Sequence, residues 1–146
     1  MIRNIVWLLA VVGIAVALPA EARDNLLDMS IEQALNTPEA KERLNKGIVF
    51  SFGDEVSVDV QESFGEYRTS KRTRAFNRDD QDACQWVFLT AMLELQKKAE
   101  SLGADAVVNI RSNWKNEQTS SSTTFVCAKG GMIAGVALIG EFVKAK

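Results

Sequence analysis

The chain has 146 residues, a hydrophobic fraction of 47% and a net charge of -2, values that describe one folded domain and not a protein that binds nucleic-acid backbones. Histidine is absent, which excludes Ser-His-Asp and Cys-His catalysis and the common histidine-containing zinc sites. We therefore expect a protein that is not an enzyme and that carries no cofactor and no metal.

The first 22 residues have the pattern of a cleavable signal peptide. Arg3 supplies the positive charge, and residues 5–18 form an uncharged apolar run of about fourteen residues, which is short for a membrane span. Residues 20–22 fit the small-x-small cleavage pattern, so cleavage after Ala22 leaves Arg23 as the first residue. We expect a periplasmic protein with no stable membrane span. An uncleaved anchor and full secretion are the alternatives.

An N-terminal helical segment is expected over residues 23–46, after a mobile leading stretch over residues 23–28. Ser30 is placed to cap a short helical turn that runs from residue 31 to 35. Thr37 followed by Pro38 then has the pattern of an N-cap with proline in the first turn, and Gly47 is expected to end the segment.

The main domain is expected over residues 47–146 and opens with strand patterns. Residues 48–52 are apolar and stop at Gly53, and valines alternate with polar residues from Val56 to Val60, as in a half-buried strand. Gly65 is expected to break the chain. Residues 67–76 are polar and basic, which predicts an exposed strand or loop.

A long helix is predicted from Arg78 to Leu102, with Asn77 as N-cap and Gly103 as C-cap. The aspartates at its start are interpreted as helix-end charges and not as a calcium site. The residues predicted to share its main apolar face are Cys84, Phe88, Ala91, Leu95, Ala99 and Leu102. Trp86, Leu89 and Leu93 widen that face, so the helix is expected to be covered on more than one side.

Three further strands are predicted at residues 106–112, 123–128 and 133–143, with a polar connection over residues 113–122. Val108 and Ile110 are expected to face inward, as are Phe125 and Cys127. The last strand is apolar on both faces, which is typical of a central strand. This order of elements predicts an α+β fold, in which a small antiparallel or mixed sheet packs one face against the long helix.

The chain holds two cysteines, Cys84 and Cys127. In an exported domain the simplest interpretation is one disulfide, which closes a loop of about 43 residues and stabilises by roughly 4 kcal/mol on the chain-entropy model. The alternative is a thiol-redox or metal-handling protein that uses the same pair, although the sequence has no Cys-x-x-Cys motif.

A basic run lies in the polar stretch after Gly65. Arg68, Lys71, Arg72 and Arg74 form a candidate anion-binding group for a lipid headgroup or another anionic envelope surface. Export argues against nucleic acid as the partner. The alternative interpretation is a solvated strand face that binds nothing.

The segment AESLGADAVVNIR at residues 99–111 resembles the signature of YbjQ-like domains and the helix-to-strand element of RcsF-like envelope stress sensors. The mature chain also resembles a group of small exported bacterial proteins at residues 52–53, 83–84 and 127–130. Some of these are labelled excinuclease subunits, an activity that the sequence contradicts because it has no P-loop and no zinc-ligand cluster. The resemblance implies a small α+β domain and, for the YbjQ-like group, ring-shaped oligomers.

These observations predict a periplasmic binding or interaction module that takes part in envelope homeostasis or stress sensing. Its expected partner is an envelope protein or an anionic envelope surface. A thiol-redox or metal-handling role and a ring-forming structural role are the alternatives, and a homo-oligomer is compatible with each.

Overall fold

The computed structural model describes residue 13 and residues 16–17, 25–55 and 58–146. The predicted signal peptide lies outside the described residues, apart from residues 13, 16 and 17, and so does its cleavage site. That interpretation stays a prediction. No helix in the described ranges is long and apolar enough to cross a membrane.

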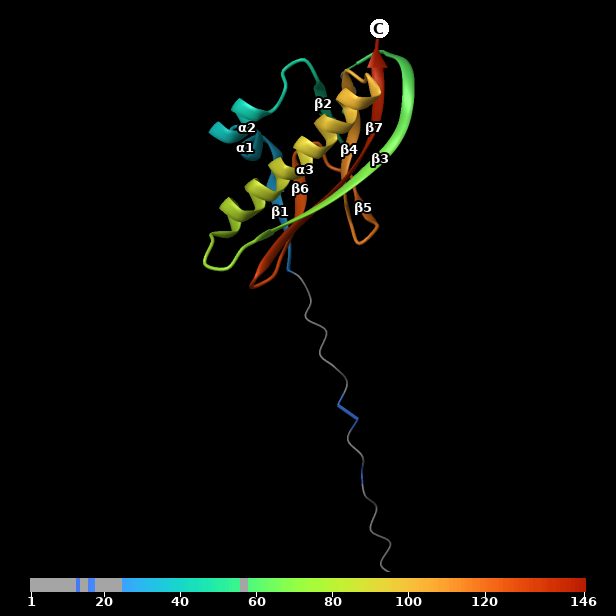
Figure 1. Ribbon diagram of the computed structural model, residues 1–146. Coiled ribbons are helices and arrows are strands. Elements are labelled where there is room, and N and C mark those ends of the chain that lie inside the picture. Colours follow the sequence, from blue (N-terminus) through green and yellow to red (C-terminus); the bar gives the residue numbers. More distant parts are fainter. Residues whose placement is uncertain (1–12, 14–15, 18–24, 56–57) are drawn as a thin grey trace, which may run out of the picture.

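The described chain forms one mixed sheet with a long helix across one face (Figure 1). This arrangement confirms the predicted α+β class. In chain order the elements are β1 (Asn25–Ser30), α1 (Ile31–Leu35), α2 (Pro38–Arg43), β2 (Val49–Phe52), β3 (Val60–Arg74), α3 (Asp80–Leu102), β4 (Ala106–Trp114), β5 (Glu117–Thr119), β6 (Thr124–Lys129) and β7 (Ile133–Ala145).

Strand β7 is the centre of the sheet, as its apolar sequence predicted. Its whole length pairs antiparallel with β3 on one edge, while β4 and β6 pair with different halves of its other edge. Strand β1 then pairs antiparallel with β6, and β2 pairs parallel with β4. Among the described strands β3 pairs only with β7, so this long, curved strand is an edge of the sheet (Figure 1).

The core lies between α3 and the inner face of the sheet. Phe88 of α3 stacks on Phe125 of β6 with ring centroids 4.1 Å apart. Cys84 and Cys127 join the same two elements through a disulfide, and both are 0% exposed. The predicted disulfide is therefore present, at a position where it ties the long helix to the sheet.

The predicted helix ends are partly confirmed. The Ser30 hydroxyl accepts a hydrogen bond from the Gln33 amide, and the Thr37 hydroxyl accepts one from Ala40, each at 3.2 Å. Gly103 ends α3 in the left-handed conformation with φ +73°. The prediction of Asn77 as N-cap is wrong, because Asn77 occupies a left-handed turn with φ +57° and the helix begins after Asp79.

Two predictions for the N-terminal segment are also wrong. Residues 25–28 are not a mobile leading stretch, since they belong to β1 and pair with β6 in a register that runs from Asn25–Lys129 to Ser30–Thr124. Helix α2 ends at Arg43 and not near Gly47. The backbone turns there because Leu44 packs against the core and the Asn45 amide donates a hydrogen bond to the Gln96 side chain on α3.

The strand predicted around Val56 and Val60 differs from the structure. Residues 56–57 lie outside the described residues, residues 58–59 have no regular structure, and β3 begins at Val60. Gly65 does not break β3, because its φ of +93° is accommodated where the register with β7 shifts. A glycine in this conformation is typical of a β-bulge, which bends a strand without ending it.

A second irregularity changes which side chains of β4 face the core. Asn109 has φ +50°, and the register of β4 against β7 shifts between Val108 and Arg111. As a result Val107 and Ile110 are both 0% exposed, while Val108 is only half-buried. The prediction that Val108 faces inward is therefore wrong, since a bulge resets the alternation on which it rested.

The polar connection predicted over residues 113–122 contains a strand that the sequence pattern did not indicate. Trp114 pairs with Glu117, so β4 and β5 are joined by a two-residue turn at Lys115 and Asn116. These two residues have φ +50° and +64°. Positive φ at both positions is the geometry of the type I′ turn that suits a tight hairpin.

Candidate binding site

The two faces of β3 carry different parts of the basic run. Lys71 faces α3, where it forms an ion pair with Glu94 at 3.5 Å. Arg72 lies on the opposite face, with its guanidinium 5.3 Å from the Trp114 ring of β4. Successive side chains of a strand point to opposite faces. The four predicted anion-binding residues therefore do not form one group, because Lys71 is separated from the three arginines.

Arg68, Arg72 and Arg74 share the outer face of the sheet, away from α3. In the antiparallel register Arg68 lies opposite Ile139, Arg72 opposite Gly135 and Arg74 opposite Ile133 of β7. All three arginines are exposed. The structure thus keeps three of the four predicted residues together and places them in a row along the edge strand.

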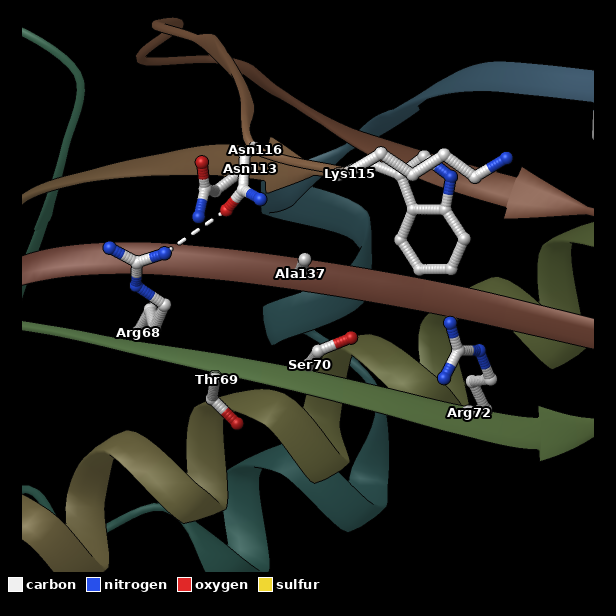
Figure 2. Close-up of a pocket in the computed structure, with 9 residues that line it drawn as sticks. Arg68, Thr69, Ser70, Arg72, Asn113, Lys115, Asn116 and Ala137 are labelled. Atoms are coloured by element: carbon white, nitrogen blue, oxygen red, sulfur yellow. Dashed lines mark hydrogen bonds between the residues drawn. The ribbon is translucent and has the colours of Figure 1, made fainter.

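A pocket of about 240 Å³ lies on this face between β3, β7 and the β4–β5 turn. Arg68 and Arg72 line the pocket from β3. Ala137 of β7 lies between β3 and the turn (Figure 2). Figure 2 shows the two arginines at opposite ends of the pocket, with Ser70 between them. Lys115 and Asn116 line the pocket from the turn.

Each pocket arginine is held by a neighbour that is not a carboxylate. Arg68 donates a hydrogen bond from Nη1 to the Asn116 side-chain oxygen at 3.0 Å (Figure 2). Arg72 lies over the Trp114 ring, an arrangement in which the ring quadrupole attracts the cation. These contacts fix the direction of each guanidinium and leave its charge without a neutralising partner.

The arginines of this row lack carboxylate partners among the described residues, in contrast to Lys71 on the opposite face of the same strand. Arg78 is paired with Asp82, Arg111 with Glu66 and Lys129 with Asp80. In the part of the chain that the structure describes, neither Arg68, Arg72 nor Arg74 forms an ion pair. The outer face of β3 is thus a concentration of uncompensated positive charge on a protein whose net charge is -2.

One polar group at the pocket has no hydrogen-bond partner in the part of the chain that the structure describes. The Trp114 side chain is 8% exposed, and its indole Nε1 is buried without a partner among the described residues. Asn113 lines the same pocket and is 7% exposed. Buried polar groups are nearly always paired in folded proteins, so the unpaired indole N–H at this pocket favours a binding role.

Trp114 reaches this position because its neighbours are small. It forms a second, separate apolar cluster with Ala128 and Ala137 on the outer face of the sheet. Gly135 lies against its ring, and a side chain at that position would meet the indole. Gly135 and Ala137 of β7 therefore form the surface on which the indole lies. The indole in turn supports Arg72.

The turn that carries Lys115 and Asn116 stores backbone strain. Both residues have positive φ without being glycine, a conformation that costs free energy and that clusters at binding sites when the surrounding structure enforces it. The turn signal was hard to find in the sequence, because Lys-Asn is not the usual Asn-Gly or Asp-Gly pair.

The other candidates from the sequence occupy structural positions. Asp80 and Asp82 at the start of α3 form ion pairs with Lys129 and Arg78, as helix-end charges. No group of three or more cysteine, aspartate or glutamate side chains that could hold a metal occurs in the described ranges. Both cysteines of the disulfide are fully buried. A protein or small molecule that reduces the disulfide would therefore first have to separate α3 from β6.

A scan of the chain against protein-family models, a search of the curated proteins and a search of the solved structures each found no match.

Proposed function

We propose that the mature chain is a non-enzymatic binding module that acts outside the cytoplasm and holds an anionic ligand in the pocket between β3 and the β4–β5 turn. The observation that carries the proposal is the pair of pocket arginines. Arg68 and Arg72 are oriented by Asn116 and Trp114, and no carboxylate of the described chain neutralises them. A guanidinium that is held in place recognises phosphate, sulfate or carboxylate at a small entropic cost.

The proposed location rests on the pattern of the first 22 residues and on the disulfide. A buried disulfide is compatible with an oxidising compartment, and disulfides are rare in cytosolic proteins. The proposed periplasmic role in envelope homeostasis or stress sensing is supported by the resemblance of residues 99–111 to YbjQ-like and RcsF-like domains. In the structure this segment spans the end of α3 and most of β4.

The binding proposal is tested with the purified, oxidised protein and inorganic phosphate as the probe. We expect phosphate to shift the NMR signals of the Arg68 and Arg72 side chains and of the Trp114 indole N–H at millimolar concentration. Arg68→Gln and Arg72→Gln should each weaken the response severalfold at its own end of the pocket, because each removes the charge-assisted contact there.

Lys71→Gln is the matched control, since it removes the same charge from the same strand but on the face that contacts α3. Its phosphate response should equal that of the unmodified protein. If all three variants show an equally weakened phosphate response, phosphate binding depends only on the net charge of the protein. The pocket is then not the binding site.

A further inference from the structure

We infer that the ligand is an acidic polysaccharide that lies along β3, and not a small molecule with a single anionic group. This inference rests on the proposed function of the pocket and identifies the class of its ligand. It follows from the spacing of the arginines along the edge strand, from the polar groups between them and from the direction of their side chains.

The spacing of the cations exceeds the reach of one anionic group. Arg68 and Arg72 are four residues apart, which corresponds to roughly 13 Å along a strand. Asn116 and Trp114 hold the two guanidinium groups at opposite ends of the pocket (Figure 2). One phosphate, sulfate or carboxylate can therefore satisfy one arginine, and a second anionic group is needed for the other.

The row continues outside the pocket. Arg74 is the next outer-facing residue after Arg72, roughly 7 Å further along the strand. It is exposed, it does not line the pocket, and its side chain forms no hydrogen bond or ion pair among the described residues. A ligand that uses all three arginines spans about 20 Å and carries anionic groups at intervals. A linear polymer has this form.

The other end of the row has a defined limit. Glu66 is the outer-facing residue that precedes Arg68, and it accepts a hydrogen bond from the Arg111 guanidinium at 2.8 Å. This ion pair neutralises both groups, so the uncompensated positive charge begins at Arg68, and the ligand should extend from there toward Arg74. The bound ligand therefore has a defined starting point at Arg68 as well as a minimum length.

The groups between the cations favour a carbohydrate. Ser70 lies between the two pocket arginines, and Asn113 and Asn116 line the pocket opposite them. Hydroxyl and amide side chains both donate and accept hydrogen bonds, which is what sugar hydroxyls require. A polyphosphate chain only accepts hydrogen bonds, so it would pair with the donors of these groups and leave the Asn113 side-chain oxygen without a donor.

The inference is tested with heparin-derived oligosaccharides, which are sulfated sugars of defined length, by calorimetric titration of the oxidised protein. We expect the octasaccharide to bind at least about tenfold more tightly than the disaccharide, since one further charge-assisted contact is worth about that factor. Arg74→Gln should weaken octasaccharide binding severalfold and leave disaccharide binding unchanged. Lys71→Gln should change neither.

The outcomes separate this inference from the proposed function. If both oligosaccharides bind equally and Arg74→Gln has no effect, the ligand is compact, and the inference is overturned while the phosphate response can still stand. Vesicles that contain an anionic phospholipid provide the second comparison. Binding to those vesicles that depends on Arg72, without octasaccharide binding, would replace the polysaccharide with a lipid surface.

Discussion

Gly135 lies directly against the indole of Trp114, so that a Cβ on Gly135 would stand only 2.3 Å from Cη2 of the ring. Arg72 lies opposite Gly135 in the β3–β7 register and its guanidinium is 5.3 Å from the same ring. One missing side chain therefore determines where the indole lies and, through it, where a pocket cation points.

Gly135→Ala is expected to push the indole out of its place. Overpacking of this kind costs about 1–3 kcal/mol of unfolding free energy, and the displaced ring should no longer support Arg72. Urea unfolding measures the first effect and the phosphate titration measures the second. Gly131→Ala is the matched control, because a Cβ there meets nothing within 4 Å. Equal behaviour of the two variants would contradict the role given to Gly135.

Asn116→Gly should separate stability from binding. Glycine adopts the observed φ of +64° without strain, so the free energy of unfolding should stay constant or rise by up to about 1 kcal/mol. Arg68 loses the oxygen to which it donates, so phosphate affinity should fall severalfold. Both quantities are measured on the same preparation by urea unfolding and calorimetric titration.

Asn77→Gly is the control for that pair of effects. Asn77 also has positive φ, at +57°, but it lies in the turn before α3 and does not line the pocket. Its glycine variant should show the same small change in stability with unchanged phosphate affinity. A loss of affinity in both variants would mean that backbone loosening, and not the Arg68 contact, controls binding.

Cys127→Ser should destabilise the protein strongly. The disulfide closes a loop with a sequence separation of 43 residues, and its loss is expected to lower the free energy of unfolding by about 4 kcal/mol. The midpoint of urea unfolding measures the change. A Cys84→Ala/Cys127→Ala double variant controls for the buried hydroxyl that serine introduces. An unchanged midpoint in both variants would show that the bridge contributes no stability.

The mass of the protein recovered from cells tests export and oxidation together. We expect a chain that starts at Arg23, is lighter than its reduced form by two hydrogen atoms, and takes up no alkylating reagent without a reductant. A full-length chain would contradict cleavage after Ala22. Uptake of the reagent at both cysteines would bring the thiol-redox alternative forward.

Signals within a few residues of each other were sufficient to predict much of the fold. Ser30, Thr37 and Gly103 were recognised as caps because a cap depends on the hydrogen bonds and φ values of one helical turn. The long helix and the central strand were recognised because their periodicity depends on residues that are close in the chain. The disulfide followed because the chain offers only one pairing of its two cysteines.

Contacts between distant segments determined the strand pairing and the strand registers, which local patterns in the sequence do not predict. Residues 25–28 form a strand because β6 offers an unpaired edge about a hundred residues later. Bulges at Gly65 and Asn109 changed the register of two strands, and a change of register reverses which face each side chain occupies.

The candidate site shows the same division. The basic residues of the run were visible in the sequence, but their separation into two faces follows from the pairing of β3 with β7 and from the position of α3. Trp114 and Asn116 were not recognised as site residues, since they reach Arg72 and Arg68 through an unexpected hairpin. Residue types and short-range order set the available chemistry, whereas the side chains that meet depend on strand pairing, which joins segments through backbone hydrogen bonds that carry little sequence information.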